Sequence, residues 1–156
     1  SMGCRMNEHS YIRNVHKELS SKVFKWKIRD SYAGGVPDAY YSGEKGCVWA
    51  EYKHIKTLPQ RDTSIIKNTL SSLQKAWLNR AMDHGQHAIL IYGFENKAAV
   101  FKDKTWEFTA ITKKELVSKF ISIIDHKRSL GNPRTFITLR VFSYSHASIK
   151  SRLGGR

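Results

Sequence analysis

Two carboxylates and one amine lie close together in the sequence between residues 34 and 56. Asp38 follows a proline, and Glu51 stands two residues before Lys53 in the run CVWAEYKH. Two carboxylates held together repel each other, and a hard divalent cation offsets that repulsion by binding both through oxygen. Such an ion lowers the pKa of a water and neutralises charge that grows on a phosphate. The three residues therefore predict a nuclease site that uses Mg²⁺, with Mn²⁺ as an expected substitute.

The elements that must position these groups are the two strands of a hairpin. The runs DAYY and CVWAEYKH are rich in aromatic and β-branched residues and flank the turn SGEKG, a pattern typical of an antiparallel pair. Side chains alternate along a strand, so Glu51 and Lys53 project from the same face. Asp38 opens the neighbouring strand, and pairing can bring both carboxylates to one end of the sheet. Lys53 has two candidate roles there, to orient or deprotonate the attacking water or to stabilise charge on the phosphorus centre.

The same residues also have an ordinary structural interpretation. Glu51 and Lys53 could form a surface ion pair, and Pro37-Asp38 could start a turn. We favour the catalytic interpretation because Glu51 and Lys53 follow Trp49 in an apolar run typical of a buried strand. Asp38 lies just across a short turn from them.

Hydrophobic periodicity predicts the remaining elements. Helices are expected over residues 6–21 with Asn7 as N-cap, over 70–85 with an apolar stripe of Leu70, Leu73, Trp77, Leu78 and Ala81, and from a capping box at Thr112 and Glu115 to a stop near Gly131 and Pro133. Further strands are expected over 23–30, 87–94, 97–103 and 134–144, and residues 57–69 are expected to form a surface loop. This order implies one domain over residues 1–156, with a mixed sheet and helices packed on its faces, which makes the fold class α/β or α+β.

The chain is strongly basic, with 27 Lys and Arg against 13 Asp and Glu and a net charge of +14. That excess favours a polyanionic partner such as nucleic acid. A membrane surface is disfavoured because no Lys-rich amphipathic helix with an aromatic face is visible, and no apolar run is long enough to span a bilayer. The two cysteines make neither a disulfide framework nor a zinc set, and the opening SMGCRMNEHS has no apolar signal region. We therefore expect an intracellular, cytoplasmic setting and no membrane partner.

Three groups of cations are candidate phosphate contacts. They are Lys25, Lys27 and Arg29, on one face of a strand whose other face carries Phe24, Trp26 and Ile28; Lys56, Arg61 and Lys67, in and beside the expected loop; and Lys150, Arg152 and Arg156, in the tail. No helix-turn-helix, zinc-finger or RNA-recognition signature is present, so we expect recognition of backbone shape rather than of base sequence.

These motifs resemble those of a known nuclease superfamily. VPD at residues 36–38 and EYK at 51–53 are similar to the PD-(D/E)xK motif of restriction-endonuclease-like nucleases. The order GVPD, EYK and QKAWL resembles the VRR-NUC branch in particular. The resemblance covers residues 7–102 and implies an α/β fold with a restriction-endonuclease-like mixed sheet flanked by helices. It offers no guidance for residues 103–156, and it makes the connection 57–69 look like an insertion that contacts substrate.

The resemblance also implies a role for each site residue. The metal ligands and catalytic groups would be Asp38, Glu51, the backbone carbonyl of Tyr52, Lys53 as catalytic lysine, and Gln74 from a helix. An acid of the first helix would join the metal site through a water, and Glu8 is preferred to Glu18 because the family position is early in that helix. On the residues alone, Glu8 could instead stabilise the helix N-terminus, and Gln74 could be solvated.

Standalone enzymes of this family resemble structure-specific DNA endonucleases, several of them symmetric dimers. The implied function is metal-dependent hydrolysis of phosphodiester bonds in branched DNA, a junction or a flap, leaving 5′-phosphate ends, by a homodimer. The small size is compatible with a phage enzyme acting in the host cell. Two alternatives stay open. A non-catalytic nucleic-acid-binding module would bind DNA in a salt-sensitive way without a metal-dependent product, and a sequence-specific restriction-type endonuclease would cut plasmid into discrete bands.

Overall fold

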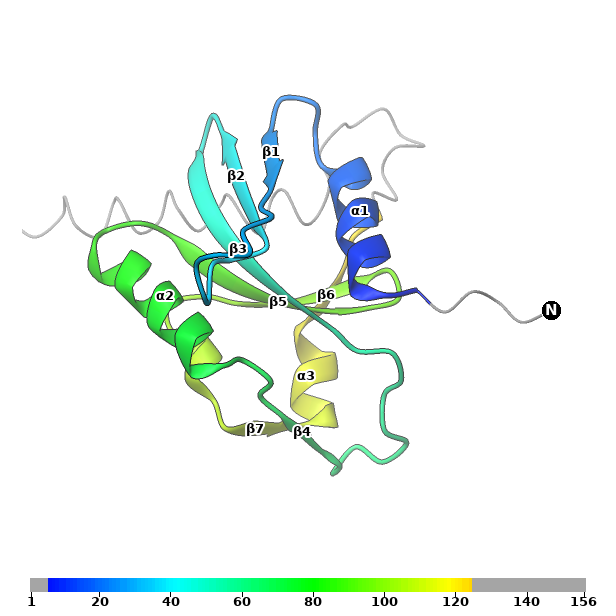
Figure 1. Cartoon of the computed structure of the whole chain (residues 1–156). Helices are drawn as coiled ribbons and strands as arrows, with labels where there is room; N and C mark the ends of the chain where they lie inside the picture. Colours follow the sequence, from blue (N-terminus) through cyan, green and yellow to red (C-terminus); the bar gives the residue numbers. More distant parts are fainter. Residues whose placement is uncertain (1–5, 125–156) are drawn as a thin grey trace, which may run out of the picture.

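The computed structural model describes residues 6–124 of the 156-residue chain. A central mixed sheet is flanked by helices on both faces (Figure 1), so the expected α/β arrangement is confirmed. The helices are α1 (Glu8–Glu18), α2 (Ser72–Asp83), α3 (Lys113–Lys119) and the short 3-10 helix η1 (Thr105–Glu107). The strands are β1 (Phe24–Lys27), β2 (Ala39–Gly43), β3 (Gly46–His54), β4 (Ile65–Lys67), β5 (Ala88–Phe94), β6 (Lys97–Phe101), β7 (Ala110–Thr112) and β8 (Phe120–Ser122).

The main sheet has six strands in the order β1-β2-β3-β5-β6-β8. Strands β3 and β5 pair in parallel, and every other neighbouring pair in this sheet is antiparallel. Strand β5 lies in the middle and is buried along its length except at Phe94, as its continuous apolar run predicts. The predicted hairpin of β2 and β3 is also confirmed, with Gly43 opposite Gly46 at its turn.

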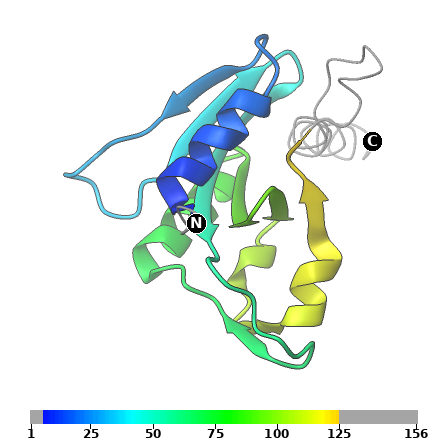
Figure 2. The same ribbon diagram turned by 90° about the vertical axis from the view of Figure 1, so that its right-hand side faces the viewer.

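Two apolar clusters form the core, one on each face of the sheet. Successive residues of β5 alternate between them, with Ile89 and Ile91 facing α1 and with Leu90 and Tyr92 facing α2 and α3. Figure 2 shows α1 on one side of the sheet and α3 on the other. This two-sided cover explains why β5 has no polar alternation.

Helix α1 is held against the sheet by its tyrosine. The predicted cap is confirmed, since the side chain of Asn7 accepts a hydrogen bond from the backbone N–H of Ser10 at 2.8 Å. The ring of Tyr11 lies over Gly93 of β5, where an added Cβ would come within 2.3 Å of the ring. The Tyr11 hydroxyl donates to the carbonyl of Lys97 at 2.7 Å. These contacts fix the helix so that its first turn lies near the end of β3.

The region expected as a surface loop, residues 57–69, contains a strand. Strand β4 pairs with β7 in a separate two-stranded sheet, with Ile66 opposite Ile111. The prediction was therefore wrong for residues 65–67, because their partner lies more than forty positions further along the chain and no local pattern reveals it.

The third helix is shorter than expected. Thr112 caps it as predicted, accepting from the N–H of Glu115, but the helix ends at Lys119 and Phe120 begins β8. The run FIS forms a strand because aromatic and β-branched residues suit one. This strand, β8, pairs with the edge of β6 that β5 does not occupy. The expected strand 134–144, the stop at Gly131 and Pro133, and the tail cations Lys150, Arg152 and Arg156 lie outside the described residues.

Two predicted apolar faces are also corrected. In α2, Leu78 and Ala81 are buried, but Leu73 is 63% exposed because it lies against the turn at Gly34 rather than against the sheet. In β1 the expected alternation holds but the burial is reversed, since Phe24 and Trp26 are 62% and 49% exposed. The reason is that α1 covers the lysine face of this edge strand. Within residues 6–124, no helix is long and apolar enough to cross a membrane.

Candidate active site

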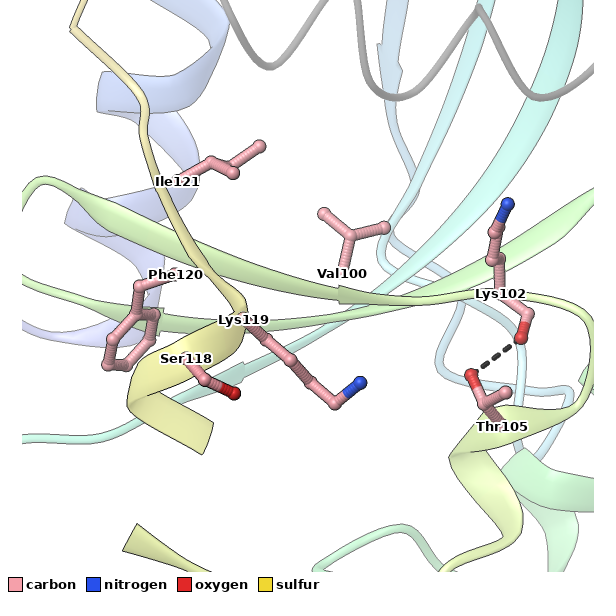
Figure 3. A pocket seen from close by; sticks show the side chains of 7 residues that line it. All are labelled: Val100, Lys102, Thr105, Ser118, Lys119, Phe120 and Ile121. Carbon is pink, nitrogen blue, oxygen red and sulfur yellow. Dashed lines mark hydrogen bonds between the residues drawn. The ribbon is translucent and has the colours of Figure 1, made fainter. Parts of the chain in front are cut away.

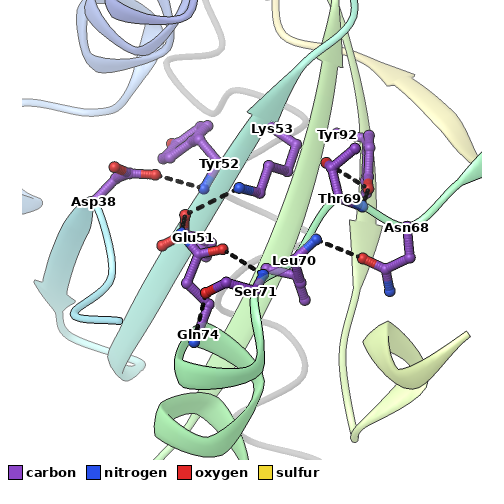
Figure 4. Close-up of polar contacts among 10 residues, drawn as sticks. All are labelled: Asp38, Glu51, Tyr52, Lys53, Asn68, Thr69, Leu70, Ser71, Gln74 and Tyr92. Atoms are coloured by element: carbon purple, nitrogen blue, oxygen red, sulfur yellow. Dashed lines mark hydrogen bonds and ion pairs between the residues drawn. The ribbon is translucent and has the colours of Figure 1, made fainter. Parts of the chain in front are cut away.

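The predicted pair of carboxylates meets where strand β2 begins. Ala39 lies opposite Ala50 in the antiparallel register, so Asp38, one position earlier, lies opposite Glu51 on the same face of the sheet. Figure 4 shows both carboxylates beside strand β3, with Lys53 and Gln74 close by. The predicted placement of both carboxylates on one face of the sheet is therefore confirmed, and their role in binding a metal stays a prediction.

Asp38 takes the place of a missing strand partner. Strand β2 begins at Ala39 while β3 continues to His54, so the edge of β3 beyond Ala50 is not covered by β2. The Asp38 Oδ2 atom accepts a hydrogen bond from the N–H of Tyr52 at 2.8 Å. In a strand, the N–H and C=O of one residue point to the same edge. The carbonyl of Tyr52 therefore faces the edge at which Asp38 lies, as the predicted role of a backbone ligand requires.

Glu51 is a buried acid with one carboxylate oxygen that lacks a hydrogen-bond partner in the described part of the chain. The residue is 3% exposed. Its Oε1 accepts from the side-chain amide of Gln74 at 3.0 Å and lies 4.0 Å from the amine of Lys53. Its Oε2 is buried and has no hydrogen-bond partner among residues 6–124. Burial, and then the charge of Asp38, raise the pKa of Glu51 to about 9, against the opposing effect of Lys53.

Gln74 reaches the site because of how its helix begins. Ser71 is the N-cap of α2, with its hydroxyl accepting from the N–H of Gln74 at 3.1 Å. The side-chain oxygen of Gln74 accepts in return from the N–H of Ser71 at 2.9 Å, which completes a capping box. That arrangement orients the amide so that its NH₂ group donates to Glu51. The structure thus brings Gln74 to the carboxylates, and the sequence reasoning did not foresee that Ser71 would fix it.

Glu8 also lies at the site. It stands in the first turn of α1, and its pKa is raised by burial first and by the charge of Asp38 second, while Lys53 lowers it. Glu18 is the last residue of the same helix. The preference for Glu8 over Glu18 is therefore supported by position, since only the first turn approaches Asp38.

These residues fit a hard divalent cation. Two carboxylates on one face, a backbone carbonyl at the same edge and a buried, unpartnered Glu51 oxygen are an all-oxygen donor set of the type that Mg²⁺ prefers. The charge of such an ion would also oppose the burial and the Asp38 charge that raise the pKa of Glu51. No group of three or more His, Cys, Asp and Glu side chains that could hold a metal occurs in the described part of the chain. A site here would therefore use two direct carboxylates, with Glu8 further out.

The predicted phosphate contacts separate into two sets. Arg29, Lys56, Arg61 and Lys67 are exposed. Lys25 is instead turned toward α1, with its amine 3.4 Å and 3.5 Å from the carbonyls of His16 and Leu19. The amine of Lys27 contacts the ring of His9, and burial followed by the charge of Arg29 lowers the pKa of Lys27. The expectation of a free basic face on β1 is corrected because α1 covers it.

Sequence reasoning also missed the aromatic residues beside the carboxylates. Tyr40 is two residues after Asp38 and Trp49 two residues before Glu51, so both rings share the face of the candidate site. This spacing of two residues along a strand was sufficient to predict that the rings and the carboxylates lie on the same face.

A separate cavity of about 390 Å³ lies between β6 and α3. Figure 3 shows Lys102 and Lys119 at its sides, with Val100 and Ile121 above the helix end. The ammonium of Lys119 stands 5.5 Å from the centre of the Phe101 ring. None of the residues that line this cavity belongs to the candidate active site.

Comparison with protein-family models finds no match, and comparison with curated proteins finds none either. Among solved structures, the chain is similar to Hjc, a Holliday junction resolvase from the archaeal hyperthermophile Archaeoglobus fulgidus. The two are 14% identical, the match covers 81% of this chain and 98% of that one, and the TM-score is 0.47.

Proposed function

We propose that this chain is a divalent-metal-dependent DNA endonuclease with a PD-(D/E)xK site of the VRR-NUC type. The observation that supports the proposal is the placement of Asp38 opposite Glu51, with the amine of Lys53 4.0 Å from the Glu51 Oε1 atom. An ordinary surface ion pair does not explain a glutamate that is 3% exposed and has an unpartnered oxygen.

Each residue has a defined task in this proposal. Asp38, Glu51 and the carbonyl of Tyr52 would hold the cation, which when bound supplies positive charge to the phosphate and lowers the pKa of a nearby water. Lys53 would orient or deprotonate the attacking water, or stabilise charge on the phosphate oxygens. Gln74 holds the Glu51 carboxylate in position through its 3.0 Å hydrogen bond. Glu8 would act through a water.

The reaction is an in-line hydrolysis. The water oxygen forms a bond to phosphorus, the bond from phosphorus to the 3′ oxygen breaks, and that oxygen leaves as a hydroxyl after taking up a proton. The products are a 3′-hydroxyl and a 5′-phosphate. We further propose branched DNA as the substrate and a homodimer as the active form, because two sites related by symmetry would cut both strands of a junction.

Two substitutions test the catalytic assignment. Asp38→Asn and Lys53→Ala should each lower Mg²⁺-dependent cleavage by roughly 100-fold or more, because each removes a group that acts on the reacting phosphate. Lys104→Ala is the matched control, since Lys104 forms an exposed ion pair with Asp83 at 2.7 Å and lies outside the site. DNA affinity without metal should change little in all three variants. Full cleavage activity in a purified Lys53→Ala sample would refute the proposed mechanism.

A substrate panel tests the rest of the proposal. Duplex, single-stranded, flap and four-way-junction DNA are incubated with and without Mg²⁺ or Mn²⁺, and the 5′ ends of the products are checked by ligation. Products from branched DNA that ligate without prior phosphorylation are expected. Salt-sensitive binding without any metal-dependent product would instead establish a binding module, and discrete bands from plasmid would establish a restriction-type enzyme.

A further inference from the structure

Four aromatic rings form a continuous row beside the two carboxylates. They belong to Trp26, Tyr40, Trp49 and Trp77. The ring centres of Tyr40 and Trp49 are 4.6 Å apart, and those of Trp49 and Trp77 are 4.9 Å apart. Trp26 lies 6.5 Å from both Tyr40 and Trp49 and ends the row on the outer strand.

The strand register places this row next to the candidate metal site. Tyr40 and Trp49 are directly opposite each other, one residue pair beyond Ala39 and Ala50, and they share their face with Asp38 and Glu51. Trp26 of β1 lies opposite Tyr40. Trp77 comes from α2, three residues after Gln74, and so stands on nearly the same side of that helix.

The row is open to solvent at its Trp26 end. Trp26 is 49% exposed, and a cavity of about 480 Å³ lies between this ring and the rings of Trp49 and Trp77. Its other lining residues are Lys27, Ile28, Arg29, Asp30 and Val36. The Asp30 carboxylate is already engaged, accepting from the N–H groups of Tyr32 and Ala33 at 2.8 Å and 3.1 Å. The groove therefore combines apolar π faces with the exposed Arg29, whereas the amine of Lys27 is turned toward His9 of α1.

We propose that this groove holds an unpaired nucleobase of the DNA strand whose phosphodiester lies at Asp38 and Glu51. The inference rests on the proposed function and specifies its substrate class. Aromatic rings stack on any base without regard to sequence, and flanking cations neutralise the phosphates of the same strand. A base inside an intact duplex is already stacked on both faces and must leave the helix first. The substrate is therefore DNA with unpaired nucleotides beside the cut, as in a flap or an open junction.

The charge of the chain favours DNA over a second copy as the occupant. The exposed Arg29 lines the groove, and the whole chain carries a net charge of +14. A second copy seated in this groove would place like charges against each other, so the proposed homodimer would use another surface, whereas a polyanionic strand is attracted to this one. Charge complementarity thus favours a DNA strand as the occupant. A phosphate of the same strand would bind the cation held by the two carboxylates.

The test is a binding experiment in the absence of divalent metal. A flap substrate carries the fluorescent base 2-aminopurine in its unpaired arm, next to the branch, and matched duplex and single-stranded DNA are measured alongside. Binding of the wild-type chain should quench the fluorescence as the base stacks on the rings. Trp26→Ala should remove the quenching and weaken flap and single-strand binding roughly 5- to 100-fold, with duplex affinity unchanged within about twofold.

Phe24→Ala is the matched control. Phe24 is 62% exposed on the same strand but does not line the groove, so its loss should change neither quenching nor affinity. An equal loss of affinity for all three DNAs in Trp26→Ala, or no loss for any, overturns the proposal. It is also overturned if Trp26→Ala converts a dimer to a monomer in sedimentation, because the groove then binds a second copy.

The outcome is separable from that of the proposed function. Cleavage of the flap by the wild-type chain with Mg²⁺ is measured in parallel. Quenching that depends on Trp26 but without any cleavage product supports the base-binding groove and refutes the nuclease. Cleavage without quenching refutes the groove and leaves the nuclease intact.

Discussion

Glu51 is held in a place where a carboxylate is unfavourable. The residue is 3% exposed, its Oε2 lacks a partner within residues 6–124, and burial and the charge of Asp38 raise its pKa to about 9. An acid whose folded pKa exceeds its unfolded value of 4.5 destabilises the fold at every pH above 4.5. Such a penalty is typical of a functional site, where stability is exchanged for chemistry.

Glu51→Gln should therefore stabilise the metal-free chain while abolishing cleavage. The neutral amide has nearly the same shape, can still accept from Gln74, and removes the buried ionisable group. We expect a gain of about 1 to 3 kcal/mol at pH 8, measured by urea denaturation. Glu44→Gln, in the exposed β2–β3 turn, is the control and should change stability by less than about 0.5 kcal/mol. A clear loss of stability in Glu51→Gln would show that the carboxylate is a structural group.

At the scale of elements, the turn before β2 is locked against the start of α2. Gly35 has a φ of +81°, and an added Cβ would lie 2.5 Å from the backbone oxygen of Leu73. This contact sets the distance between the segment before β2, which carries Asp38, and the helix that carries Gln74. The neighbouring Gly34 is different, because its Cβ would meet only the side-chain end of Leu73, at 2.8 Å.

Gly35→Ala should consequently destabilise the chain by about 2 kcal/mol or more, through the strained backbone and the clash with a carbonyl that cannot move freely. Gly34→Ala is the matched control and should lose less than about 1 kcal/mol, because the exposed Leu73 side chain can rotate away. Thermal or urea unfolding of the two variants makes the comparison. Equal losses would show that the turn does not touch α2 in the way described.

Helix α1 is joined to the sheet by a buried polar chain. The Nε2 atom of His16 lies 2.8 Å from the hydroxyl of Tyr41, which lies 2.5 Å from the hydroxyl of Tyr52. Burial first, and then the charges of Lys25 and Lys27, lower the pKa of His16 to about 4. The folded chain therefore resists protonation of this ring.

Stability should fall as the pH drops from 6.5 toward 4. In that window the unfolded chain binds a proton at His16 and the folded chain does not, so the slope of unfolding free energy against pH is positive. His16→Gln keeps a polar partner for Tyr41 but cannot titrate, so the fall should be smaller in this variant. Melting temperatures at pH 7 and pH 4.5 measure the difference. Identical pH profiles of the two proteins would refute the role of His16.

At the scale of the whole molecule, the charge of +14 determines the salt dependence expected of the proposed DNA binding. Binding to a polyanion releases counterions, so affinity falls steeply with salt. For about six neutralised phosphates, the loss is roughly 1000-fold between about 50 and 200 mM salt. The exposed cations Arg29, Lys56, Arg61 and Lys67 are the described candidates for this interaction.

Substitution of two lysines should distinguish a lysine that contacts phosphate from one with a structural role. Lys67→Ala removes an exposed cation and should reduce the magnitude of the slope of log K against log salt by about 1. Lys25→Ala removes an amine directed at the carbonyls of His16 and Leu19, so the slope should stay the same. Fluorescence anisotropy titrations at several salt concentrations provide both slopes. A reduced slope for Lys25→Ala alone would instead place the phosphate contact at Lys25, on the side of β1 that faces α1.

Local chemistry was sufficient to predict several parts of this protein from the sequence. Alternation along CVWAEYKH and the glycine-bounded turn put Asp38 and Glu51 on one face, and side-chain caps at Asn7 and Thr112 marked helix starts. These features depend only on residues within a few positions of one another. The same locality explains why the hairpin and the central apolar strand were predicted with nearly correct bounds.

Only the tertiary structure decided which groups meet and which faces are covered. The parallel pairing of β3 with β5 and the capping box of α2 bring Gln74 to Glu51, and the packing of α1 brings Glu8 rather than Glu18 toward Asp38. The same packing covers Lys25 and leaves Trp26 exposed, the reverse of the sequence expectation. The physical reason is that alternation separates the two faces of a strand, whereas the element that buries one of them comes from elsewhere in the chain.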